Sequence, residues 1–288
     1  MADLSFVFDA VGRIFPFDFM QARFMQQALV GLVLLAPMCA AMGVQVVNFR
    51  MAFFSDAISH SAFAGVALGL IMSTDVRLTM TGLALLVGLA ITAVGRRGSL
   101  STDTVIGVFF SAMVAFGLAV VSRDRLVARD MQRFLYGDIL TISEAEIAWL
   151  AALFLVLMAF QAIGYNHMLY AGLNRSLASA HRIRVRLYQY VFAGLLSLVV
   201  IFSVWAVGVF LVTAMLIVPA ASARNFARSA GAMFWWALVV ALTSAVAGLF
   251  VSVQPWARTA TGATVVLVAC AWFVLSALVV LMRRGRAA

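Results

Sequence analysis

Nine apolar stretches follow one another along this chain, and they limit what it can fold into more than any other feature. A bilayer core is crossed by about 20 helical residues, and only helices or closed barrels satisfy every backbone polar group inside it. Several of these stretches exceed the roughly 18 residues that a helix needs to span a bilayer. The sequence therefore predicts an all-α, polytopic membrane bundle. The stretches are residues 25–47, 52–72, 78–95, 104–122, 144–164, 188–206, 207–222, 232–252 and 262–282.

The seventh stretch is short and follows the sixth almost directly. We expect a short returning helix there, broken near Gly208 and Pro219, so the chain has eight or nine crossings. The composition agrees with a membrane protein, since 65% of the residues are hydrophobic and 11% are charged, against about 25% charged in a soluble domain. No loop is large enough to form a soluble domain, the longest expected one being 165–187. We therefore expect one transmembrane domain over residues 1–288, with no cleavable leader.

All twenty cationic residues are arginines, and their distribution predicts the orientation of the chain. Twelve lie in one set of alternating loops and eight in the other, so the first set should face the cytoplasm. The N-terminus is then outside and the C-terminus inside. One loop, 123–133, is arginine-rich on the outer side, and we expect it to lie along the membrane interface. No clustered basic face is present in the sequence, so the positive charge does not indicate nucleic-acid binding.

The stretch 50–70 carries an aspartate, Asp56, and a histidine, His60, one helical turn apart. Ionisable groups at membrane depth are costly unless they are paired, hydrated or used. The spacing places both side chains on one helix face, where a carboxylate and an imidazole are suitable ligands for a divalent metal. The competing interpretation is structural: Asp56 caps the helix, and His60 bonds to a neighbouring serine or to backbone. On the functional interpretation a second copy of the chain would double the number of ligands.

A second candidate region runs from Pro219 to Arg228. The proline ends or kinks the apolar run, small residues follow, and Arg224 and Arg228 are spaced to share one helix face. Such a segment is suited to docking on a cytoplasmic partner. The alternative is an ordinary helix end whose arginines extend their charged groups to the interface.

Other polar or reactive residues are assigned structural roles. Asp103 is expected to cap the helix that begins there. His167 and His181 are expected in the exposed 165–187 loop, without a ligand partner. Cys39 and Cys270 lie in apolar runs, and we expect both to be small core residues.

Three separated motifs resemble the ABC-type importer permeases for zinc, manganese and iron. They are Arg-Met-Ala-Phe-Phe-Ser-Asp-Ala-Ile-Ser-His-Ser-Ala at 50–62, Leu-Tyr-Gly-Asp-Ile-Leu at 135–140, and the run from Val207 to Arg224. Weaker matches are Ser-Thr-Asp-Thr-Val-Ile-Gly at 101–107 and Thr-Gly-Ala-Thr at 261–264. The resemblance covers roughly residues 20–282 in the same order.

This resemblance implies a type II ABC importer permease in a bacterial cytoplasmic (inner) membrane. It would act as a homodimer with two cytoplasmic ATP-binding subunits and an extracytoplasmic metal-binding protein. Asp56 and His60 match the family's metal path, with zinc expected before manganese or iron as transported substrate and no permanent cofactor. The residues that match its coupling segment are Pro219, Ala220, Ala221, Arg224 and Arg228.

The chain is not expected to be an enzyme. Its sequence holds no Gly-x-x-x-x-Gly-Lys-Ser/Thr loop, so ATP hydrolysis would belong to a separate subunit. The alternative function is an ion-gradient-driven metal carrier or channel without an ATPase. Such carriers often show inverted repeats and several intramembrane acids, whereas this sequence has one well-embedded acid, Asp56.

Overall fold

The computed structural model describes residues 5–98, 100–122, 139–173, 178 and 181–285, and within these it is all-helical. Nine of the described helices are long and apolar enough to cross a membrane. This confirms the predicted polytopic bundle and agrees with nine crossings, the higher of the two expected numbers. The helices are α1 (Ser5–Ile14), α2 (Arg23–Asn48), α3 (Phe54–Ile71), α4 (Val76–Arg97), α5 (Thr102–Val121), α7 (Glu144–Leu173), α9 (Val185–Val207), α10 (Val209–Phe226), α11 (Ala230–Val253) and α12 (Thr261–Gly285), with 3-10 turns η1 (Asp18–Gln21) and η2 (Ile139–Thr141).

The seventh apolar stretch forms a helix of its own. Gly208 separates α9 from α10 with φ 89°, a backbone conformation that a residue with a Cβ atom rarely adopts, so the chain reverses there within one residue. The expected break at Gly208 is confirmed. The expected end or break at Pro219 is wrong, because α10 continues through the proline to Phe226.

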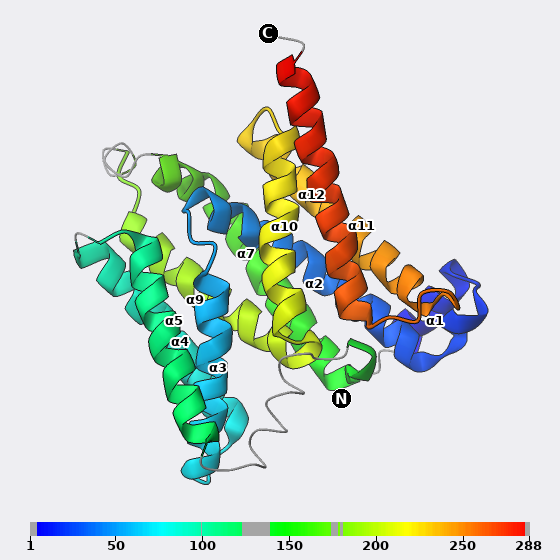
Figure 1. The fold of residues 1–288 in the computed structure, drawn as a ribbon, viewed down its shortest axis with the longest axis horizontal. Helices are drawn as coiled ribbons and strands as arrows, with labels where there is room; N and C mark the ends of the chain where they lie inside the picture. The colour runs from blue at the N-terminus through cyan, green and yellow to red at the C-terminus, as the bar shows by residue number, and fades with distance from the viewer. Residues whose placement is uncertain (1–4, 99, 123–138, 174–177, 179–180, 286–288) are drawn as a thin grey trace.

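Successive helices alternate in direction, so their ends collect at two ends of the molecule. Figure 1 shows the C-terminal ends of α2, α4, α7, α10 and α12 in the upper part of the view. The residues that follow these helices belong to the arginine-richer set of loops. The fold therefore gathers onto one end the loops that the charge count assigned to a single side.

Helix α2 forms the centre of the bundle. It is almost entirely buried and packs against α7, α10 and α11. Its contact with α10 depends on Gly43, where an added Cβ would overlap the carbonyl oxygen of Leu216. Close approach of backbones through small residues is the usual way for membrane helices to pack, since lipid provides no hydrophobic drive between them.

A tight turn joins α2 to α3. The Met51 amide donates to the Val46 carbonyl over 3.0 Å and the Arg50 amide to the Val47 carbonyl over 3.2 Å, the bonding pattern of a Schellman cap. Arg50 takes the left-handed position of that cap, with φ 56°. The chain then descends before α3 begins, so that α3 starts well below the end of α2 in Figure 1.

Three local predictions are wrong. His167 lies in α7, which continues to Leu173, so the loop before α9 is shorter than 165–187. The cap of α5 is Ser101, whose hydroxyl accepts the Thr104 amide hydrogen over 3.1 Å, while Asp103 lies inside the first turn. Arg228 lies beyond the end of α10 at Phe226, so it does not share a helix face with Arg224.

Candidate functional site

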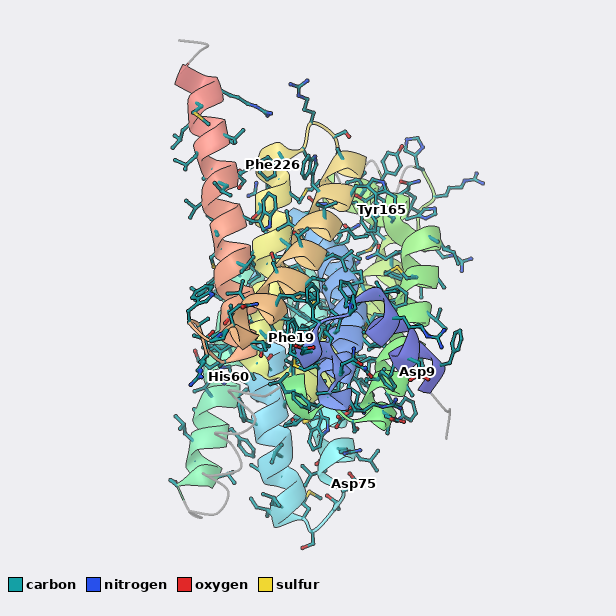
Figure 2. The ribbon with its side chains drawn as sticks, turned by 90° about the vertical axis from the view of Figure 1, so that its right-hand side faces the viewer. Asp9, Phe19, His60, Asp75, Tyr165 and Phe226 are labelled. Atoms are coloured by element: carbon teal, nitrogen blue, oxygen red, sulfur yellow. The ribbon has the colours of Figure 1, made fainter. Side chains whose placement is uncertain are left out.

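The first three turns of α3 are buried on almost every side. From Phe54 to Gly65, Asp56 and His60 are the two residues that are not buried. They lie one turn apart, as the sequence predicts, and define a narrow open face on this otherwise buried stretch of α3. Figure 2 shows His60 near the middle height of the molecule, between Asp75 at the lower end and Phe226 near the upper end.

The Asp56 side chain lines a hollow of about 600 Å³ that lies between α3, α10 and the start of α12. We call it the Asp56 hollow. The predicted side-chain cap at Asp56 is wrong, because Phe53 occupies the capping position of α3 and no described side chain caps the helix. Among the described residues, the Asp56 carboxylate makes no hydrogen bond and no ion pair. It is therefore an open acceptor beside an accessible space.

His60 contacts aromatic rings. Its imidazole meets the ring of Phe110 from α5 edge-on, with centroids 4.9 Å apart, and lies 5.5 Å from the ring of Phe63. The predicted alternative of a hydrogen bond to a neighbouring serine is wrong for both neighbours: Ser61 donates to the Ile58 carbonyl, and the Ser59 hydroxyl has no partner in the described structure. The ring nitrogens of His60 are thus unengaged among the described residues.

The Asp56 hollow unites stretches that are far apart in the sequence. Its other walls come from the 207–224 and 261–264 motifs, including Thr213 on α10 and Thr261 on α12. Both threonines carry hydroxyl oxygens that could contribute to a polar path, and both were missed as candidates. Their position inside the two motifs could have indicated them as candidates. Only the packing of α3 with α10 and α12 shows that both threonines line the Asp56 hollow.

The ligand set in one copy is incomplete. Among the residues described, no group of three or more His, Cys, Asp or Glu side chains is arranged to hold a metal. Asp56 and His60 together provide one oxygen and one nitrogen donor, fewer than the four that closed zinc sites contain. A site of this kind suits a transported ion, which must leave as easily as it enters.

The structure separates the candidate coupling residues into two groups. Pro219 and Ala220 are buried within α10, where Ala220 faces the close contact with α2. Arg224 and Arg228 are exposed at the end of the molecule near Phe226. Ala221 is half-buried between the two groups. A partner at this end would therefore meet the arginines, while the proline and alanines shape the helix behind them.

Two predicted features fall outside the described residues. These are the arginine-rich 123–133 loop and most of the 135–140 motif. The motif's last two residues, Ile139 and Leu140, begin η2, and Ile139 is buried against α2 near Gly31.

Comparison with known proteins finds relatives along nearly the whole chain. The high-affinity zinc uptake system membrane protein ZnuB of Haemophilus influenzae is 30% identical over 249 residues, covering 86% of this chain and 95% of that protein. The manganese transport system membrane protein MntC of Halalkalibacterium halodurans is 29% identical over 276 residues, covering 96% of this chain and 91% of MntC.

Solved structures agree with the fold. PsaBC from Streptococcus pneumoniae, determined in complex with Fab, superposes with a TM-score of 0.74 at 27% identity, with 95% of each chain covered. An inward-facing putative metal-chelate type ABC transporter superposes with a TM-score of 0.73 at 12% identity, over 96% of this chain and 97% of the other, which supports the fold alone. Residues 21–280 match the ABC 3 transport family, and the chain belongs to that family.

Proposed function

We propose that this chain is the permease subunit of an ATP-binding-cassette importer that carries a divalent metal ion, zinc before manganese or iron, across the bacterial cytoplasmic membrane. The metal is the transported substrate rather than a resident cofactor. The single observation that carries the proposal is the open pair Asp56 and His60 on the otherwise buried stretch Phe54–Gly65, with Asp56 lining a hollow whose other walls come from family motifs. The zinc and manganese transport named for the relatives supports the choice of cargo.

The active unit is proposed to be a homodimer. The open face of α3 and the Asp56 hollow leave room for a second copy, whose own Asp56 and His60 would bring the donors to two oxygens and two nitrogens. Four donors of this kind match the number that zinc prefers, while manganese and iron accept the same ligand types. A site shared by two copies also opens when the copies move apart, which lowers its affinity and releases the ion.

ATP hydrolysis is assigned to separate cytoplasmic subunits. We propose that they contact the chain at Arg224 and Arg228, and that their closure moves α10, which lines both the Asp56 hollow and the contact with α2. An extracytoplasmic metal-binding protein would deliver the ion at the opposite end. In this arrangement the N-terminus lies outside and the C-terminus inside, in keeping with the arginine distribution.

The proposal is tested by zinc and manganese accumulation in cells that lack their own uptake systems and express this chain with its neighbouring subunits. His60→Ala should reduce accumulation at least about tenfold, because a lost ligand in a small site costs more than 1.4 kcal/mol. His167→Ala, which removes a half-buried histidine of α7 that stacks on Tyr188, is the matched control and should leave accumulation unchanged. Normal uptake by His60→Ala at equal membrane abundance would overturn the site.

A second measurement tests the assembly. The chain should co-purify with an ATP-binding subunit, and Arg224→Ala combined with Arg228→Ala should weaken that association. If transport proceeds with no ATP-binding subunit present, the importer assignment is wrong and a gradient-driven carrier takes its place.

A further inference from the structure

A second hollow lies at the opposite end of the molecule from the candidate coupling residues. It has a volume of about 420 Å³ and is lined by the starts of α4 and α7 and by the end of α9. We call it the rim hollow. Helix α9 forms its floor, since 61% of the most apolar stretch of α9 is buried, against 28% for α4 and for α7. The rim hollow is thus a groove between two outer helices over a recessed one.

The polar side of the rim hollow is built from interlocked residues. Ser143 and Glu146 form a reciprocal cap at the start of α7, the Ser143 amide donating to Glu146 Oε2 over 2.8 Å. The other carboxylate oxygen, Oε1, accepts the indole N–H of Trp205 over 2.8 Å. The guanidinium of Arg77 lies 4.7 Å from the ring of Trp205. A helix cap, an indole and a cation are therefore held together across three helices.

Arg77 carries the positive charge in this groove, and it is not neutralised by either nearby acid. Asp75 uses its carboxylate to cap α4, accepting the amide hydrogens of Arg77 and Leu78. Among the residues that the structure describes, the Arg77 guanidinium makes no salt bridge, although Asp75 and Glu146 line the same hollow. The guanidinium stacks on the Trp205 ring and makes no side-chain hydrogen bond to the described residues, so its five N–H donors are available to an anionic oxygen.

Apart from Thr81, the rest of the groove is apolar and partly exposed. Trp149 is 63% exposed and stacks on Phe202, with centroids 6.2 Å apart, and Leu78 is 74% exposed. Figure 2 shows Asp75 at the lower end of the molecule, far from Phe226. Tryptophans, a cation and acids at the end of membrane-spanning helices occupy the depth at which lipid headgroups lie.

We propose that the rim hollow binds the headgroup and upper acyl chain of a zwitterionic aminophospholipid, such as phosphatidylethanolamine. Arg77 would hold the phosphate through charge-assisted hydrogen bonds. The ammonium would lie between the Glu146 carboxylate and the open face of Trp149. An acyl chain would follow the apolar floor of α9. Two carboxylates beside one arginine disfavour a purely anionic headgroup, which selects the zwitterionic class.

The test uses the full chain, purified in a mild detergent and mixed with one lipid at a time, all with identical acyl chains. Native mass spectrometry measures the fraction of protein that retains phosphatidylethanolamine, phosphatidylglycerol or phosphatidylcholine. The ethanolamine lipid should be retained about fivefold more than either of the others, the factor that one favourable charge near a membrane surface provides.

Two variants locate the site. Arg77→Gln should lower retention of phosphatidylethanolamine about fivefold. Glu146→Gln keeps one acceptor oxygen, which can still close the helix cap, while its NH2 group cannot accept the Trp205 indole hydrogen as Oε1 does. This variant should remove the preference for the ethanolamine lipid over the choline lipid. Arg258→Gln is the matched control, since Arg258 is exposed in the loop between α11 and α12 and does not line the hollow.

The proposal is overturned if the unaltered chain retains the three lipids equally, or if Arg77→Gln and Glu146→Gln keep the full preference while melting at the same temperature as the unaltered chain. It is also overturned if Arg77→Gln leaves lipid retention intact but weakens binding of an extracytoplasmic metal-binding protein. The rim hollow would then be a protein-docking surface. Metal accumulation is not part of this readout, so the lipid proposal stands or falls separately from the proposed function.

Discussion

Asp56 in the first turn of α3 and Glu146 in the first turn of α7 have opposite surroundings. Glu146 on α7 accepts two hydrogen bonds, one from the Ser143 amide and one from the Trp205 indole. Asp56 on α3 lies deeper in the bundle and accepts none from the described residues, although it borders a hollow. An acid that caps its helix gains hydrogen-bond partners, whereas an acid left open at membrane depth indicates a role in ion binding.

The largest expected effect comes from Asp56→Asn. Zinc accumulation should fall at least about tenfold, because the neutral amide is a poor ligand for a dication. The melting temperature should stay the same or rise, since no hydrogen bond is lost and a desolvated charge is removed. Accumulation is measured in transport-deficient cells and melting in detergent.

Asp103→Asn is the control for this change, because Asp103 is an exposed acid in the first turn of α5. It should leave accumulation unaffected. A fall in melting temperature with Asp56→Asn would show that the carboxylate has a structural role, and the contrast between the two helix starts would disappear.

The sequence predicts only part of the surroundings of Asp56 and Glu146. The spacing of Asp56 and His60 predicts their shared face, because helical periodicity fixes it. The Asp56 hollow was not predictable from spacing, since Thr213 and Thr261 reach it only through the packing of α10 and α12. The partner of Glu146 was equally hidden, because Trp205 is 59 residues away in the sequence.

Local boundaries failed where two signals compete. Ser101 and Asp103 are two positions apart, and either residue type can cap a helix. In the structure the Thr104 amide donates to the Ser101 hydroxyl, so the serine is the cap. His167 was assigned to a loop because the hydropathy of 144–164 falls off there, yet tertiary packing extends α7 to Leu173. Arg228 missed the expected face because α10 ends two residues earlier, which spacing alone does not reveal.

A second prediction concerns the tightly packed contact between α2 and α10, in contrast to the open face of α3. Gly43→Ala should destabilise the chain by about 1–3 kcal/mol, because its new Cβ would collide with the Leu216 carbonyl and force α2 from α10. Gly82→Ala is the control, since nothing lies within 4 Å of an added Cβ there, and it should be neutral or stabilising. Thermal unfolding in detergent separates the two, and equal melting temperatures would contradict the packing.

The third prediction is a loss of stability without a loss of zinc uptake, the reverse of the result expected for Asp56→Asn. Glu146→Ala should destabilise the chain by about 1 kcal/mol, because the cap of α7 is lost and the Trp205 indole loses its acceptor. Zinc uptake per folded chain should not change, since Glu146 is remote from Asp56 in the fold. A large loss of uptake without a loss of stability would place Glu146 on the metal path instead.

The smallest effect is expected at the surface ion pair between Arg23 and Glu144, 3.1 Å apart with both side chains more than 40% exposed. Glu144→Gln should change stability by less than about 0.5 kcal/mol, and added salt should abolish even that difference. The measurement is the melting temperature at low and high salt. A larger effect would mean that this end of the bundle depends on charge more than on the packing around α2.

The most direct test of the account is a double-mutant cycle on initial zinc uptake, comparing Asp56→Asn, His60→Ala and the combined variant at matched membrane abundance. If both side chains hold the same ion in transit, each single change should remove most of the uptake and the combination should be scarcely worse than either, because one broken ligand set cannot be broken twice. Near-normal uptake in either single variant, or losses that simply multiply, would contradict a shared metal site on α3.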